Sequence, residues 1–229
     1  MSGSPDTRTL WVFGYGSLMW QPGFPFVEMR HARLFGYHRS FCIYSLHYRG
    51  TPERPGLVLG LARGGTCQGV AFRVADTDAA AVRSYLHARE LIYGVYREAI
   101  LTAVIDGEQG PALVDVLTYI AETGHPSFAG TRVSMARRSA IIRAARGKAG
   151  SNLSYFVATL SKLRELGISQ PDLERLAVAA GAGGSFAHDA TARILEGRHR
   201  AFALRPCTKR SFVRNDRRHA FAYRRRLSP

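Results

Sequence analysis

Apolar stretches rich in β-branched and aromatic residues recur through the first 121 residues of the chain. Such stretches predict β-strands when clusters of Gly, Pro, Asn or Asp separate them. The pattern predicts strands over residues 9–15, 33–44, 57–63, 67–74, 97–105 and 111–121. Gly64-Gly65 and the segment DGEQG at 106–110 each indicate a hairpin turn, and the Pro- and Gly-containing stretch 45–56 indicates a longer loop.

Helical spacing of apolar residues interrupts this pattern once and later replaces it. Residues 76–93 begin with Asp and Thr as capping candidates, and Gly94 is a plausible stop. Further on, residues 134–146, 151–165 and 170–179 each have apolar side chains near the 3.6-residue period. A block of strands followed by a block of helices, with few β-α-β alternations, favours an α+β fold.

The formal net charge of +15 is unevenly distributed over the 229 residues. Residues 185–229 contain 12 Lys/Arg and 3 Asp/Glu, a balance of +9, whereas the preceding 184 residues contain 20 and 14, a balance of +6. We therefore expect a globular domain over residues 1–183 and a basic, poorly ordered tail over 184–229. Basic residues mixed with aromatics can bind nucleic acid, but this tail contains no recognisable module, so nucleic acid is not the expected partner.

The cysteines and the hydropathy indicate the compartment. Cys42, Cys67 and Cys207 are far apart and form no C-x-x-C pair, which fits a reducing cytosol and predicts neither a disulfide framework nor a zinc site. The N-terminal residues lack the basic and apolar regions of a secretory signal. No stretch approaches the ~18 apolar residues of a membrane helix, so we expect a cytoplasmic protein without a membrane partner.

One stretch, WVFGYGSLMW at residues 11–20, combines a predicted strand with a small polar loop. A loop of glycine and serine exposes backbone N–H groups, which bind anions or polarised carbonyl oxygens. Glycine also lets a ligand approach the main chain closely, because it has no side chain. Residues 14–18 are therefore a candidate binding loop.

The helix predicted over residues 76–93 places one carboxylate in an unusual position. At 100° per residue, Arg89 lies within the apolar face that contains Val82 and Leu86, and Glu90 lies at its margin. Two interpretations remain open for Glu90. It forms a structural ion pair with a neighbouring arginine, or it is a partly desolvated carboxylate with a raised pKa, suited to acid–base chemistry.

Motifs of several other enzyme classes are missing. Ser17 lacks the flanking glycines of a G-x-S-x-G nucleophile elbow, and Gly147-Lys148 lacks the upstream glycine of a P-loop. The sequence has no H-E-x-x-H motif, and its eight histidines do not pair with cysteines at metal-ligand spacing.

Five segments, taken together and in this order, resemble the ChaC-like γ-glutamylcyclotransferases, especially their bacterial branch. They are FGYGSLMW at 13–20, GYHRSFCIYS at 36–45, YRGTPERPGLVLGL at 48–61, ARELIYGVY at 88–96 and AARGKAGSNLSYFVATLSKLRELGI at 144–168. The resemblance spans about residues 9–180. No segment is specific by itself, but the set is, and the tail after residue 184 matches no feature of the family.

The resemblance implies a fold and a reaction. The fold is a small mixed β-barrel with helices packed around it. The reaction cleaves the γ-glutamyl amide of glutathione into 5-oxoproline and cysteinylglycine, with no metal and no organic cofactor. The substrate's own α-amine attacks its γ-carbonyl, so no enzyme nucleophile is required, and Ser17 is expected to bind rather than to attack.

The resemblance also implies the site residues. Glu90, in the R-E pair, corresponds to the family's catalytic glutamate and is the expected general acid/base. The loop that holds the γ-glutamyl group corresponds to Tyr15, Gly16, Ser17 and Leu18. Further residues expected at the site are Tyr96, Asn152 and Tyr155.

Two alternatives remain from the sequence. The first keeps the reaction but changes the substrate to another γ-glutamyl amine or peptide, because one sequence does not identify the residues around the leaving group. The second is a non-catalytic binding or regulatory module that uses the basic tail.

Overall fold

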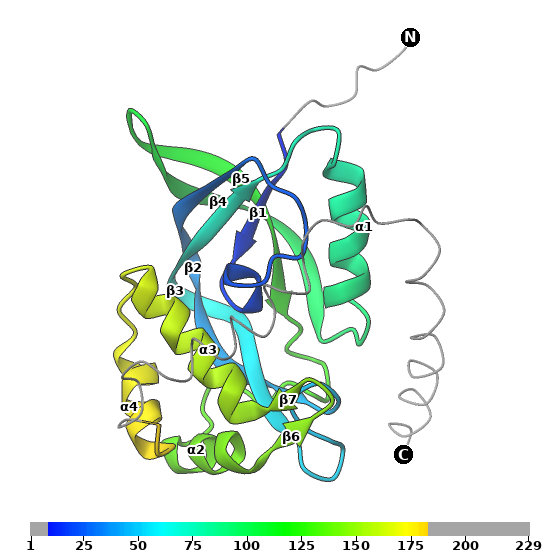
Figure 1. Cartoon of the computed structure of the whole chain (residues 1–229), viewed down its shortest axis with the longest axis vertical. Helices are drawn as coiled ribbons and strands as arrows, with labels where there is room; N and C mark the ends of the chain where they lie inside the picture. Colours follow the sequence, from blue (N-terminus) through cyan, green and yellow to red (C-terminus); the bar gives the residue numbers. More distant parts are fainter. Residues whose placement is uncertain (1–8, 183–229) are drawn as a thin grey trace, which may run out of the picture. The chain divides into compact units, whose positions relative to one another are not determined.

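The computed structural model describes residues 9–182, which form a closed five-stranded barrel with four α-helices (Figure 1). The predicted α+β class and the mixed β-barrel are confirmed. The barrel strands are β1 (Trp11–Gly14), β2 (Glu28–Ser45), β3 (Gly56–Arg73), β4 (Tyr96–Gly107) and β5 (Gly110–Ala121), in the order β1-β3-β2-β4-β5. The expected tail over 184–229 lies outside the described residues.

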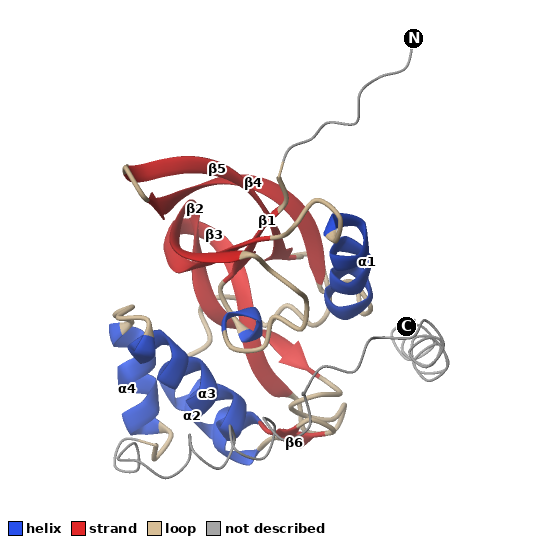
Figure 2. Ribbon diagram, turned by 45° about the horizontal axis from the view of Figure 1, so that its top comes forward, coloured by secondary structure: helices blue, strands red, loops and turns tan. Residues whose placement is uncertain are grey.

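The short strand β1 closes the barrel. It pairs antiparallel with β3, from Trp11 opposite Arg73 to Gly14 opposite Val70, and parallel with β5 through Trp11–Val116 and Val12–Leu117. All other strand pairs of the barrel are antiparallel, so the sheet is mixed. Figure 2 shows the strands curling around a common interior.

The hairpin predicted at Gly64-Gly65 is wrong. Residues 56–73 form the single strand β3, which pairs with β2 from Gly56 opposite Ser45 to Arg73 opposite Glu28. The φ angles of Gly64 and Gly65 are 93° and 74°, and Gly36 on β2 has a φ of 79° at the matching irregularity of the register. Positive φ occurs in a β-bulge as well as in a turn, and here the glycines of both strands lie at one register shift.

The helices begin and end close to the predicted positions. They are α1 (Ala79–Glu90), α2 (Met135–Ala144), α3 (Asn152–Glu165) and α4 (Pro171–Ala179). Ser134 and Ser151 cap α2 and α3 with their side chains, as the Ser preference at N-caps predicts. In both views α1 lies on the side of the barrel away from α2, α3 and α4 (Figures 1 and 2).

Three further short elements connect these parts. The 3₁₀ helix η1 (Ser17–Met19) follows β1, and the two-residue strands β6 (Arg146–Gly147) and β7 (Gly150–Ser151) form a small ladder before α3. None of the helices in residues 9–182 is both long and apolar enough to cross a membrane.

Candidate active site

The loop after β1 is fixed against the barrel through its first residue. The Tyr15 hydroxyl donates to the carbonyl oxygen of Tyr119 at 2.8 Å, and the Tyr15 carbonyl accepts from Arg39 Nε at 2.5 Å. Tyr15 and Leu18 are buried, whereas Ser17 is partly exposed. The loop therefore has a rigid base and a polar residue toward solvent.

Three consecutive N–H groups in this loop lack an acceptor in the part of the chain that the structure describes. Met19 N–H donates to the Gly16 carbonyl and Gln21 N–H to that of Ser17, both at 2.9 Å, which forms the 3₁₀ turn. The first N–H groups of a helix have no internal partner. Within residues 9–182, no acceptor is bonded to the N–H groups of Gly16, Ser17 or Leu18. These three donors are available to an anion or a polarised carbonyl.

Gly16 lies against β3 and α3. A Cβ atom built at Gly16 would lie 3.7 Å from the Leu59 side chain and 3.7 Å from the Tyr155 hydroxyl, which is ordinary contact distance. The loop thus meets Leu59 and Tyr155 at one point.

The Leu59 peptide brings two of the predicted tyrosines together. Its carbonyl accepts from the Tyr96 hydroxyl at 2.7 Å, and its N–H donates to the Tyr155 hydroxyl oxygen at 3.4 Å. Burial raises the pKa of Tyr155 to about 12 and the pKa values of Tyr15 and Tyr96 well above 10. All three phenols are therefore neutral near pH 7. Since Tyr155 accepts from Leu59, its own O–H proton remains a donor for a ligand.

Aromatic and cationic groups hold Tyr155 in place. Its ring packs against Trp20 and Phe41, with centroid distances of 5.8 Å and 6.0 Å. The Arg49 guanidinium lies 5.5 Å from the ring centroid, and its Nη1 donates to Ser154 Oγ at 3.1 Å. The phenol therefore has a fixed direction, which suits a substrate contact.

Glu90 is the last residue of α1, and both interpretations from the sequence apply to it. Its side chain is 18% exposed, and Oε1 lies 2.9 Å from Arg89 Nε. Burial raises the pKa of the Glu90 carboxyl, and the Arg89 guanidinium partly opposes that rise. The Glu90 charge in turn contributes to the raised pKa values of Tyr15, Tyr96 and Tyr155, because it lies near all three phenols.

Arg89 is a candidate site residue that the sequence did not assign. Its Nη2 donates to Ser17 Oγ at 3.0 Å, and its Nη1 donates to the carbonyls of Gln21 and Pro22 at 2.8 Å and 3.0 Å. The same guanidinium contacts Glu90, so it connects the end of α1 to the binding loop. The position of this charged residue within an apolar helix face could have indicated a role. The loop that Arg89 contacts is 72 residues away in sequence, so the helical pattern does not indicate that contact.

Asn152 has a different position from the other predicted site residues. Its side chain is fully buried, accepts from the Leu57 N–H at 2.6 Å and donates to the Leu57 carbonyl at 2.7 Å. These two bonds fix the start of α3 to β3, which positions Tyr155 one turn further along the helix. Direct binding of substrate by Asn152 stays a prediction.

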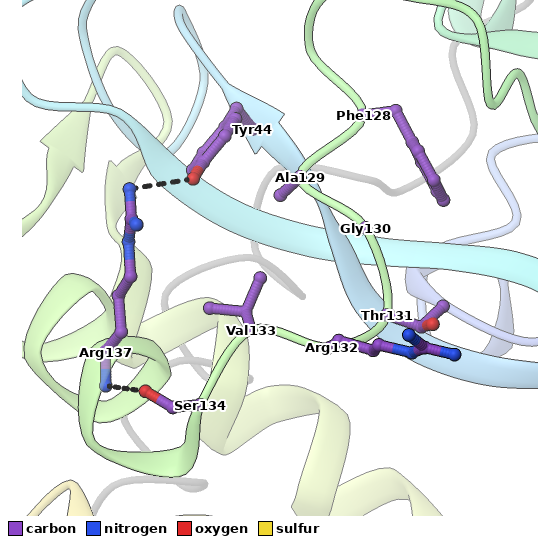
Figure 3. Close-up of a pocket in the computed structure, with 9 residues that line it drawn as sticks. All are labelled: Tyr44, Phe128, Ala129, Gly130, Thr131, Arg132, Val133, Ser134 and Arg137. Atoms are coloured by element: carbon purple, nitrogen blue, oxygen red, sulfur yellow. Dashed lines mark hydrogen bonds between the residues drawn. The ribbon is translucent and has the colours of Figure 1, made fainter.

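A separate hollow of about 560 Å³ lies beside the segment that precedes α2 (Figure 3). It is lined by Tyr44, Phe128, Ala129, Gly130, Thr131, Arg132, Val133, Ser134 and Arg137. It contains none of the predicted site residues. Figure 3 shows Arg137 bonded to the Tyr44 hydroxyl and Arg132 on the other side of the hollow, so the polar groups do not converge.

No group of three or more His, Cys, Asp or Glu side chains within residues 9–182 is arranged to hold a metal ion. The chemistry available at the site is that of one carboxylate, three arginines, three phenols and the loop N–H groups.

Comparison with solved structures gives the class of fold. The crystal structure of a selenomethionine-labelled γ-glutamyl cyclotransferase specific to glutathione from yeast matches with a TM-score of 0.68 and 21% identity, over 80% of this chain and 100% of that chain. A second yeast crystal structure with the same description matches with a TM-score of 0.64 and 20% identity, over 79% and 100%. The barrel is therefore that of the γ-glutamylcyclotransferases.

Comparison with sequences gives the family. The family model described as ChaC-like protein matches residues 10–180, and the chain belongs to this family. The glutathione-specific γ-glutamylcyclotransferase of Escherichia coli is 34% identical over 176 residues, which cover 76% of this chain and 74% of that protein. The protein of the same description from Schizosaccharomyces pombe is 32% identical over 185 residues, which cover 74% and 90%.

Proposed function

We propose that this protein is a glutathione-specific γ-glutamylcyclotransferase that releases 5-oxoproline and cysteinylglycine in the cytoplasm. The observation that supports it best is the connection through Arg89, which joins the half-buried Glu90 to the loop with three free N–H groups. The curated relatives with this activity cover most of the chain, and the ChaC-like family model over residues 10–180 includes both features. The buried free thiols of Cys42 and Cys67 fit a reducing compartment.

The reaction is an intramolecular aminolysis. The α-amine of the γ-glutamyl group attacks the γ-carbonyl carbon, a new C–N bond closes the five-membered ring, and the amide bond to cysteine breaks. A flexible chain must be held in a folded conformation for this attack, and such positioning is worth up to several kcal/mol. The binding loop and Tyr155 are the groups that we expect to hold it.

Glu90 moves the proton in this scheme. An α-amine with a pKa of about 8 is largely protonated at neutral pH, so a base must accept a proton before or during the attack. Glu90 accepts that proton and delivers one to the departing nitrogen of cysteinylglycine. A partly buried carboxyl suits both roles because its pKa lies closer to neutrality than that of an exposed carboxyl.

The binding loop stabilises the developing charge. As the amine attacks, the γ-carbonyl oxygen becomes negative, and N–H groups already directed at it lower the barrier. Ser17 and Leu18 supply these donors in the proposal. Ser17 Oγ is bonded to Arg89, which agrees with a binding role for this residue.

The direct test is incubation of the purified protein with glutathione and mass spectrometry of the products. We expect 5-oxoproline and cysteinylglycine in equal amounts. A panel of other γ-glutamyl amines and peptides at the same concentration tests the alternative substrates. Products from the panel but not from glutathione would reject the proposed specificity and keep the reaction type.

Gly16→Val is expected to raise the KM for glutathione at least about tenfold, because its branched methyls extend beyond the Cβ position toward Leu59 and Tyr155. Gly16→Ala is the matched control. Its Cβ meets only ordinary contacts, so we expect near-normal kinetics. Steady-state kinetics of both variants measure this, and an unchanged KM for Gly16→Val would contradict a substrate-binding loop.

Arg89→Met is expected to shift the acid limb of the pH–rate profile to higher pH. The Glu90 carboxyl must be ionised to accept a proton, so activity falls as the pH drops through its pKa. Arg89 lowers that pKa, so its removal raises the pKa and activity is lost at a higher pH. Arg83→Met, on the exposed side of the same helix, is the control and should leave the limb in place. Coincident profiles for both variants would exclude an effect of Arg89 on Glu90.

A further inference from the structure

Arg39 is a buried arginine on β2 that has no role in the proton transfer or in the oxyanion contacts proposed above. The residue is 7% exposed, and its Nε donates to the Tyr15 carbonyl at 2.5 Å. Its Nη2 donates to the Gln68 carbonyl at 2.6 Å and contacts Met19 Sδ at 3.7 Å. Its Nη1 is buried and has no hydrogen-bond partner among the described residues.

The charge of Arg39 is not neutralised by the part of the protein that the structure describes. Every bonded partner of the guanidinium is a neutral carbonyl or thioether, and no carboxylate in residues 9–182 forms an ion pair with it. A buried charge is costly when it has no opposite charge, and an unbonded N–H adds to that cost. Such an arrangement is expected where a ligand brings the missing negative charge.

The position of Arg39 places this charge under the binding loop. Arg39 is the register partner of Leu61, and Phe41 is that of Leu59, so these side chains share one face of the sheet. Gly16 lies against Leu59 on that same face. Arg39 is therefore beneath the loop rather than on the far side of the barrel wall.

The bond to Tyr15 also sets the direction of the loop's first free donor. In a trans peptide the C=O and the following N–H point in opposite directions. Because the Tyr15 carbonyl points at Arg39, the Gly16 N–H points away from it. A charged donor on the carbonyl polarises the peptide and strengthens the N–H as a donor. The positive charge thus acts on a ligand through this peptide.

We propose that Arg39 is a positioning residue that directs the α-carboxylate of the γ-glutamyl group to the Gly16 N–H of the binding loop and so leaves the α-amine to Glu90. This inference rests on the proposed function. The γ-glutamyl Cα bears a negative carboxylate and a positive ammonium group. Among the described residues, the site offers the guanidinium of Arg39 beneath the loop and the carboxylate of Glu90 at the end of α1. The charge of Arg89 is paired with Glu90, and Arg49 is bonded to Ser154 on α3, so Arg39 is the group beneath the loop that can attract the carboxylate.

The test compares two substrates that differ only in the carboxylate. 4-Aminobutyryl-cysteinylglycine has a hydrogen in its place, retains the attacking amine and cyclises to 2-pyrrolidone. We expect the wild type to have a much higher kcat/KM for glutathione. Arg39→Met should reduce that preference roughly tenfold, through the KM for glutathione, because a unit charge several ångströms away acts most strongly on the substrate that carries the α-carboxylate.

A structural role for Arg39 would change the kinetics of both substrates by the same factor, and an unchanged ratio in Arg39→Met would overturn the inference. Arg39→Lys keeps the charge, so its ratio should stay within about threefold of wild type. If Arg39→Met does not fold, a collapsed ratio in folded Arg39→Lys would overturn the inference instead. A wild type that cyclises neither substrate removes the proposed function and this inference together, whereas an active wild type with an unchanged ratio in the variants removes this inference alone.

Discussion

Glu90→Gln is expected to retain the fold and glutathione binding but to lower turnover by roughly 10²–10⁴-fold, the usual contribution of a general acid/base. The amide has the size of the carboxyl and keeps an oxygen that can accept from Arg89 Nε, so the loop that Arg89 holds should remain in place. It cannot accept the proton of the attacking amine. The loss should therefore appear in kcat, with KM nearly unchanged.

Glu98→Gln is the matched control for this prediction. Glu98 is also a half-buried carboxylate, with a side chain 21% exposed, and it pairs with Arg83 and His87. Loss of that pair should leave turnover within about twofold, because the Arg83 and His87 partners are exposed and no step of the proposed reaction uses them. Near-normal turnover by Glu90→Gln would remove Glu90 from the mechanism, and equal losses in both variants would indicate a general effect of altering this surface.

Asn152→Ala is expected to lower the free energy of unfolding by about 3 kcal/mol. The substitution leaves both the N–H and the carbonyl of the buried Leu57 without a partner, and each unsatisfied group costs about 1–3 kcal/mol. Urea denaturation followed by circular dichroism measures the change. Ser161→Ala, in the middle of the same helix, is the control and should stay within about 0.5 kcal/mol of wild type.

The same variant distinguishes a structural role of Asn152 from direct contact with the substrate. If Asn152 only fixes α3, saturating glutathione should restore little of the activity that Asn152→Ala loses. The lost activity should then follow the fraction of unfolded protein as denaturant is added. An Asn152→Ala protein with wild-type stability and a raised KM would instead assign Asn152 to direct contact with glutathione.

Much of the architecture could be predicted from local patterns. The periods of apolar residues located α1 to α4 and the β4–β5 hairpin within a few residues, because each of these elements is short and bounded by clear capping or turn residues. The pair Gly64-Gly65 misled the prediction, since two positive-φ glycines in sequence indicate a turn and a bulge equally well. Only the pairing with β2, which continues on both sides of the two glycines, distinguishes the two.

The site was partly predictable for a related reason. Its place at the margin of an apolar helix face indicates Glu90 as a candidate, and the glycines indicate the loop. Arg39 and Arg89 were not assigned, because their contacts join segments 24 and 72 residues apart in sequence. Pairing across such distances depends on barrel register, which no local period encodes.

The strand that closes the barrel is also the strand that leads into the binding loop. β1 has four residues, and its partner positions on β3 and β5 lie roughly 60 and 105 positions later in the chain. Contacts of such long range form slowly, because loop closure must precede them. A chain whose other four strands have paired still lacks its binding loop until β1 docks. The onset of turnover during refolding should therefore follow the last kinetic phase of folding, and no partly folded species should cleave glutathione.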